Sequence, residues 1–167
     1  MCIRDRVLTR HDPYPAWVVR HPFTFLRANR AAEAMFPGLT QMPAEALIDL
    51  WFGPGPFRDS VQNWPDVLNA GLAALRRDAA ATGGPTTLTL LRRAQAAAGP
   101  AAGRIGAAGT GHSPVVCPVF TLDGHVVRTI SAVMRFDTAV EVTTSQLRIE
   151  LTFPADHATK VFFHGQT

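Results

Sequence analysis

The chain has 167 residues, of which 47% are hydrophobic and 17% charged, and its formal net charge is +3. This length and apolar content suit one domain with a sizeable core. The positive charge is small and spread along the chain, which argues against a nucleic-acid-binding surface.

The first eleven residues are interpreted as a non-native or disordered segment. Met1 to Arg6 has no periodicity and looks like the adaptor-derived end of a metagenome-assembled gene, so we exclude it from the fold. The domain is then expected over residues 12–164, with the natural protein beginning further upstream.

Two short β-rich runs, residues 16–20 and 23–28, flank His21-Pro22 and predict a hairpin. Asn29 is expected to cap a helix over residues 30–36, because its side chain can accept from the free amides of a first turn. A second short helix is expected over residues 44–52.

The aromatic stretch Leu47–Trp64 is the part around which we expect the fold to be organised. Its rings are separated by Gly53-Pro54-Gly55-Pro56, a break that no helix or strand crosses unbent. Aromatic side chains bury large areas, so the segment should lie in a core. The rings of this stretch are Trp51, Phe52, Phe57 and Trp64.

Two further helices should follow this stretch. Asn63 is the expected N-cap of the first, which ends at Gly83-Gly84 and buries one face. The second spans residues 85–98, with Leu88, Leu91, Ala94 and Gln95 on one side. Residues 99–111 are rich in Ala and Gly and predict a flexible loop. The buried face of the first helix consists of Trp64, Val67, Leu68, Gly71, Leu72 and Leu75.

The last part of the chain alternates with the period of β-strands. A strand over residues 115–121 contains Pro118, which places it at a sheet edge, and Asp123-Gly124 predicts a hairpin turn. A short helix should follow Pro154. The core-facing residues expected of the last two strands are Ile130, Ala132, Met134 and Phe136, then Leu147, Ile149, Leu151 and Phe153.

Two strands, a helical middle and a closing three-strand meander indicate an α+β fold. We expect a five-stranded antiparallel sheet with helices packed on one face, which is the element order of a PAS-like sensor.

Several pieces of sequence together resemble the ligand-binding domain of MmyB-like transcription regulators. They are Pro15-Ala16-Trp17-Val18, Asn29 with Ala31-Ala32, the run from the aromatic stretch through Phe57-Arg58 to Asn63-Trp64, and Leu75-Arg76. The resemblance covers residues 12–163. It implies a bacterial PAS-like sensor that binds a small or fatty-acid-like molecule and is joined to an N-terminal helix-turn-helix domain, which this chain lacks. It therefore implies DNA as a partner only through that missing domain.

From the residues we predict an elongated apolar pocket between helices and sheet, because rigid rings beside a proline break leave space. Arg58 needs a partner, either Asp59, Asp66 or a helix-end carbonyl, or else a ligand carboxylate. The predicted site residues are Phe36, Trp51, Phe52, Phe57, Arg58, Trp64, Leu68, Leu72, Ile130, Met134, Phe136, Ile149 and Leu151.

Other chemistries find little support in the sequence. The six histidines have no spacing typical of metal ligands, and the helical middle lacks the cysteine of a flavin photosensor and the histidine of a haem sensor. We expect no cofactor and no catalysis. A small cone-like α+β enzyme with an apolar cavity, or a dimerisation module that forms a homodimer, stays open as an alternative.

Cys2 and Cys117 are interpreted as free thiols of a reducing compartment. No apolar run approaches the roughly 20 residues of a membrane helix, and no signal peptide is evident. We therefore expect a cytoplasmic protein that does not contact a membrane.

Overall fold

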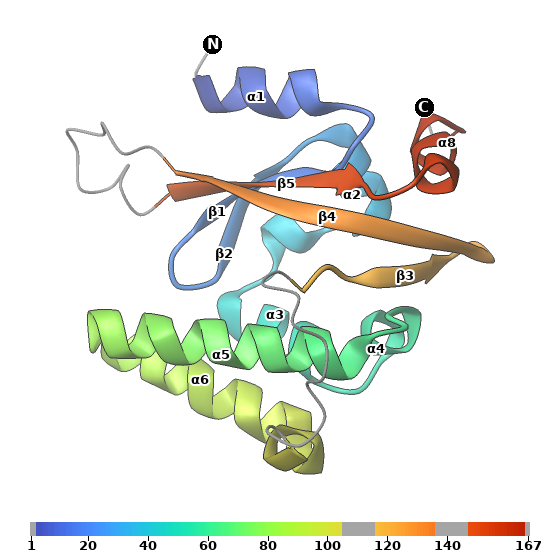
Figure 1. The fold of residues 1–167 in the computed structure, drawn as a ribbon. Coiled ribbons are helices and arrows are strands. Elements are labelled where there is room, and N and C mark those ends of the chain that lie inside the picture. The colour runs from blue at the N-terminus through green and yellow to red at the C-terminus, as the bar shows by residue number, and fades with distance from the viewer. Residues whose placement is uncertain (1–2, 105–115, 136–146, 166–167) are drawn as a thin grey trace. The chain divides into compact units, whose positions relative to one another are not determined.

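The computed structural model describes residues 3–104, 116–135 and 147–165 (Figure 1). It divides into two compact units. The first unit combines residues 1–43 with residues 125–167, and the second spans residues 44–124.

The strands form one five-stranded sheet in the order β2-β1-β5-β4-β3 (Figure 1). Four of them belong to the first unit and β3 to the second. The expected α+β class and five-stranded antiparallel sheet are confirmed. The strands are β1 (Ala16–Arg20), β2 (Thr24–Ala28), β3 (Val119–Leu122), β4 (His125–Arg135) and β5 (Leu147–Pro154).

The pairing within the first unit assigns each residue to a face of the sheet. Ile149 of β5 lies opposite Val18 of β1 and Met134 of β4, and residues directly opposite each other in antiparallel strands share a face. Trp17 lies opposite Glu150 and points the other way, because neighbouring residues of a strand alternate. We call these the α1 face and the Trp17 face.

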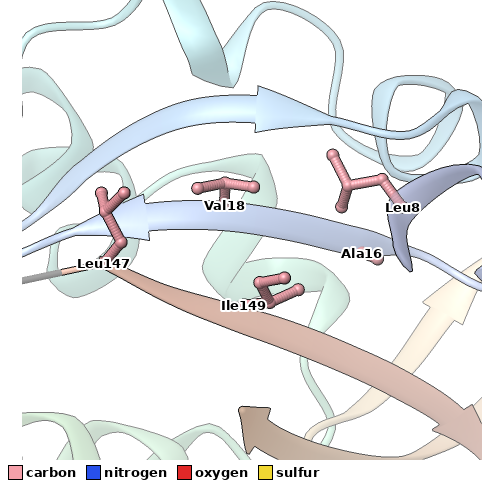
Figure 2. Close-up of a cluster of buried hydrophobic side chains, with 5 residues drawn as sticks. All are labelled: Leu8, Ala16, Val18, Leu147 and Ile149. Carbon is pink, nitrogen blue, oxygen red and sulfur yellow. The ribbon is translucent and has the colours of Figure 1, made fainter. Parts of the chain in front are cut away.

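The α1 face is covered in part by helix α1 (Ile3–His11), within the segment expected to be non-native or disordered. Leu8 is only 5% exposed because it packs into a cluster on β1 and β5, shown in Figure 2. Nine residues are too few for a stable isolated helix, so this packing stabilises it, and sequence periodicity alone could not reveal it. The other members of the cluster are Ala16, Val18, Leu147 and Ile149.

Asn29 caps α2 (Arg30–Met35), as predicted, and its side chain also bonds to backbone groups outside this helix. Its Oδ1 accepts from the amides of Ala32 and Ala16, both at 3.0 Å. Its Nδ2 donates to the carbonyls of Leu8 and Tyr14 at 3.3 and 2.8 Å. One buried amide therefore joins α1, β1 and α2.

The expected inward face of β4 is wrong for the described residues. Ile130 is 47% and Met134 38% exposed, whereas Val127 and Thr129 are buried. The alternation was read correctly, but α1 covers β1 and β5 and leaves these β4 side chains open. Phe136 lies outside the described residues.

The terminal helix α8 (His157–Gly165) begins after Asp156, whose carboxylate accepts from the amide of Thr159 at 2.7 Å. The buried Thr159 hydroxyl in turn accepts from the amide of Arg128 in β4 at 2.9 Å. These bonds hold the helix against the sheet.

In the second unit, most predicted helix boundaries are confirmed. On α6 the expected Ala94 is buried, but Leu88 is exposed, and Thr87, Leu90 and Ala98 are buried in addition. The small alanines suit the contacts of α6 with two helices, α3 and α5. Of the expected loop over residues 99–111, the first part forms η2 and the rest lies outside the described residues. The elements are α3 (Ala44–Phe52), α4 (Pro56–Ser60), α5 (Trp64–Thr82), α6 (Pro85–Ala98) and η2 (Gly99–Arg104), while η1 (Leu39–Gln41) belongs to the first unit.

β3 begins at Val119, directly after Pro118, and not at residue 115. The predicted turn at Asp123-Gly124 is confirmed: both residues have positive φ, 48° and 78°, as a two-residue hairpin turn of type I′ requires.

Candidate functional site

The aromatic segment of the second unit turns sharply between α3 and α4. A side chain at Gly53 would place its Cβ 2.5 Å from the carbonyl oxygen of Asp49, and Gly55 has a φ of 146° that favours glycine. Pro56 then starts α4, where the absent amide hydrogen costs nothing. The predicted break is therefore confirmed, and it folds the rings back on one another.

Phe57 is the centre of the resulting ring cluster and is only 6% exposed. Its ring stacks on Trp51, with centroids 4.4 Å apart and planes at 26°. It meets Trp64 and Phe120 edge-on, at 6.4 and 6.2 Å. We call Trp51, Phe57, Trp64 and Phe120 the aromatic cluster.

Three predicted site residues, Phe52, Leu68 and Leu72, are at most 3% exposed. The ring of Phe52 approaches α5 so closely that a Cβ at Gly71 would lie 3.0 Å from its Cε1. This tight fit shows that Phe52 contributes to packing within the unit.

Arg58 and Trp64 place two hydrogen-bond donors at the cluster. The guanidinium carbon of Arg58 lies 5.9 Å from the Trp64 ring centroid, a cation–π distance. Arg58 is exposed and forms no salt bridge with any described residue, so the expected pairing with Asp59 or Asp66 is wrong. The indole Nε1 of Trp64 is buried and has no hydrogen-bond partner within the described part of the chain.

Asn63 fixes the cluster by a contact that the sequence did not reveal. It occupies the N-cap position of α5 as expected, but its side chain makes no capping bond. Its Nδ2 instead donates to the carbonyl of Cys117 at 3.0 Å, and its Oδ1 accepts from the amide of Val119 at 2.9 Å. Together with the bridge between Val61 and Phe120, these bonds bring Phe120 to Phe57.

The predicted site residues of the first unit lie on two faces of its sheet. Ile149, Leu151, Ile130 and Met134 share the α1 face by register. Phe36 contacts Trp17, with ring centroids 6.2 Å apart, on the opposite side. Within this unit, the predicted site residues therefore do not line one side of a single pocket.

Trp17 is a functional candidate that the sequence reasoning missed. It is 7% exposed, and its indole Nε1 has no hydrogen-bond partner among the residues described. The sequence showed that Trp17 lies in a predicted strand, but it could not show that the indole Nε1 lacks a hydrogen-bond partner among the described residues.

One comparison decides what kind of domain this is. A family model for the MmyB-like transcription regulator ligand binding domain matches residues 4–164. The chain belongs to this family. No curated protein and no solved structure matches the chain. The match begins inside α1, ahead of residue 12.

Three hollows on the first unit of this MmyB-like domain, of about 510, 280 and 290 Å³, adjoin Arg27, and none of the three is lined by a predicted site residue. Charged residues of both signs line them, including Arg30 and Glu33 at the largest. Such walls do not suit an apolar molecule.

The described residues of the MmyB-like domain contain no group of three or more His, Cys, Asp or Glu side chains placed to hold a metal ion. Cys117 is a free thiol, and Cys2 lies outside the described ranges. No helix within those ranges is long and apolar enough to span a membrane.

Proposed function

We propose that this domain senses an elongated, mostly apolar acid such as a fatty acid, and that the ligand's acid group binds at Arg58. The proposal is supported by the family, whose members are ligand-binding domains of transcription regulators. Its central observation is the exposed guanidinium of Arg58 over the ring of Trp64, whose buried Nε1 has no hydrogen-bond partner among the described residues.

The aromatic cluster suits such a ligand for a physical reason. Its rings stack and meet edge-on, and Phe57, Trp64 and Phe120 are buried while Trp51 is half-buried. An acyl chain that entered beside them would meet a rigid apolar wall and would cost little side-chain entropy. A guanidinium at its margin can hold a carboxylate through two parallel hydrogen bonds. Within the described residues Arg58 has no acidic partner that would compete.

Binding would affect transcription through a helix-turn-helix domain outside this chain. A ligand that prefers one packing of the aromatic segment shifts the domain toward that packing, and an attached DNA-binding domain could respond to the shift. We place this regulator in the cytoplasm with a PAS-like sensor architecture, and we expect no catalytic turnover.

The direct test combines identification and affinity. Mass spectrometry of organic extracts of the purified protein should detect a co-purifying acyl compound. Thermal shift with fatty acids of medium and long chain should show stabilisation, since a ligand that binds only the folded state raises its stability. No extracted compound and no shift with any apolar acid would refute the proposal.

Arg58→Gln isolates the role of the guanidinium. We expect at least a tenfold loss of affinity for the fatty acid, because a charge-assisted pair contributes about 1.5–3 kcal/mol. Arg92→Gln is the matched control, since Arg92 is an exposed arginine of α6. Equal affinities of the two variants would exclude Arg58 as the anchor.

The chain alone is not expected to bind a specific DNA sequence, because its net charge is only +3 and dispersed. Fluorescence anisotropy with duplex DNA at physiological salt should show no sequence-selective, submicromolar binding.

A further inference from the structure

Strand β2, at one edge of the sheet, is interrupted by a β-bulge beside Arg27. Arg27 pairs with Val18 of β1. The next residue of β1, Val19, pairs with Phe25, so Leu26 is an extra residue in β2. Leu26 packs against the cluster on the α1 face, and Arg27 shares that face because it lies opposite Val18. The bulge therefore directs two neighbouring side chains to one face, as bulges at sheet edges commonly do.

The largest of the three hollows that adjoin Arg27 lies between β2, α2 and η1. It has a volume of about 510 Å³, within the roughly 300–1,000 Å³ range of small-molecule sites. All its lining residues belong to the first unit. We call it the Arg27 hollow, and its charged or hydroxyl-bearing side chains are Arg27, Arg30, Glu33 and Thr40.

The two arginines of the Arg27 hollow have guanidinium N–H groups to offer a ligand. Both side chains are exposed, and Arg30 forms no salt bridge with any described residue. The Nε atom of Arg27 lies 3.9 Å from Oδ1 of Asp5, which is too long for a hydrogen bond. The hollow therefore presents two cations whose donors are not consumed by a close acidic partner in the described ranges.

Glu33 and Thr40 add an acceptor and a further donor to the same hollow. Oε1 of Glu33 accepts from the amide of Gly38 at 2.8 Å, which holds the carboxylate in place and leaves Oε2 for a ligand. Oγ1 of Thr40 accepts from Nε2 of Gln41 at 2.8 Å, so the hydroxyl hydrogen can be donated to a ligand. The walls thus carry two positive charges and one negative charge, a net charge of +1.

We propose that the Arg27 hollow binds an acidic amino acid, with its two carboxylates at Arg27 and Arg30 and its ammonium group at Glu33. Such a ligand has two negative charges and one positive charge, the complement of the walls. A guanidinium holds a carboxylate through two parallel hydrogen bonds, and an ammonium group donates to a carboxylate oxygen. This site goes beyond the proposed function, because it lies in the other unit from Arg58 and takes a hydrophilic ligand.

The experiment is isothermal titration calorimetry on the full chain with three probes, at low salt because exposed charge pairs are screened. L-Glutamate should bind more tightly than glutarate, which lacks the ammonium group, and than L-glutamine, which lacks the second carboxylate. Arg27→Gln and Arg30→Gln should each weaken L-glutamate binding about fivefold. Arg20→Gln is the matched control and should leave the affinity unchanged, since Arg20 is an exposed arginine of the same hairpin and lines none of the three hollows.

Glu33→Gln tests the proposed place of the ammonium group by the sign of its effect. A glutamine keeps an oxygen that can accept from Gly38, but it removes the negative charge. Binding of L-glutamate should therefore weaken about threefold, whereas binding of glutarate should strengthen, because a carboxylate no longer repels it. Weakening of both ligands, or of neither, would overturn the assignment.

The remaining results decide the ligand class and leave the fatty-acid proposal untouched. Wild-type protein that binds glutarate as tightly as L-glutamate, or that binds none of the three probes, overturns the amino-acid site. Because Arg27, Arg30 and Glu33 are exposed, the ligand-free variants should melt at the wild-type temperature. An affinity loss that follows a lower melting temperature would mark a structural role and would also overturn the site.

Discussion

Asn63 and Val119 are joined by a hydrogen bond of 2.9 Å from the amide of Val119 to Oδ1 of Asn63. Nδ2 of the same side chain donates to the carbonyl of Cys117. A residue at the start of α5 therefore holds the strand that carries Phe120 of the aromatic cluster. These partners are more than 50 residues apart along the chain.

Asn63→Ala should destabilise the protein by about 1–3 kcal/mol, because it leaves two half-buried backbone groups without partners. Asn63→Asp should also destabilise the protein, since a carboxylate still accepts from Val119 but turns its second oxygen toward the carbonyl of Cys117, where Asn63 donates. Urea unfolding measures both. Gln62→Ala is the neighbouring control: among the described residues its side chain bonds only to Thr121, in an exposed position, so the loss should stay within about 0.5 kcal/mol. Equal effects of the two alanine variants would contradict the assignment.

Asn29→Ala should lower the free energy of unfolding by about 3 kcal/mol. The change removes an N-cap and leaves the carbonyls of Leu8 and Tyr14 without their donor. Hydrogen exchange should also accelerate in α1, which loses one of its ties to β1. Asn69→Ala in α5 is the control, because that half-buried side chain makes no hydrogen bond to another described residue. Unchanged exchange in α1 would show that Leu8 alone holds the helix.

Cap and turn residues account for the helix and strand boundaries that were predicted correctly. Asn29, the Gly53–Pro56 break and Asp123-Gly124 each impose a local backbone geometry, and the structure places an element end at all three. Such signals act over a few residues, so sequence alone is sufficient to read them.

The choice of buried face could not be predicted in the same way. β4 alternates as expected, yet Thr129 is buried and Ile130 is 47% exposed. Alternation separates two faces but does not tell which one a neighbour covers, and α1 had been excluded from the fold. The predicted site residues were split between faces for the same reason. Trp17 and Trp64 each have a buried Nε1 without a hydrogen-bond partner in the described ranges, and this depends on long-range packing that a local sequence pattern does not show.

Gly71→Ala should destabilise the protein by about 1 kcal/mol. An added Cβ would lie 3.0 and 3.1 Å from two carbons of the buried Phe52 ring, and overpacking costs roughly 1–3 kcal/mol. The gain in helix propensity, up to about 1 kcal/mol, offsets only part of this. In a Phe52→Leu background the same Gly71→Ala change should become neutral or stabilising, because the smaller side chain leaves room. Stabilisation by Gly71→Ala alone would show that the ring moves freely.

The ion pair between Asp49 of α3 and Arg93 of α6 should make stability depend on pH. Nε of Arg93 donates to Oδ1 of Asp49 at 2.8 Å, and a second guanidinium nitrogen donates to Oδ2. These hydrogen bonds hold the pKa of Asp49 below its ordinary 3.8, although burial opposes them; the opposite charge of Arg93 adds to the lowering. A carboxyl group whose pKa is lowered by folding stabilises the folded state at pH above the unfolded value. That contribution is lost as the pH falls through the folded pKa.

Asp49→Asn should therefore lower the urea midpoint at pH 7 and should have little effect once the pH is well below 3.8. Because both side chains are about half exposed, the loss should be modest and should shrink at high salt. A double-mutant cycle with Arg93→Gln is the control, since removing either partner should remove the same interaction. The coupling between the two substitutions should be present at pH 7 and absent in acid. Coupling that persists in acid would mean that Asp49 and Arg93 interact through packing of α3 on α6 and not through the carboxylate charge.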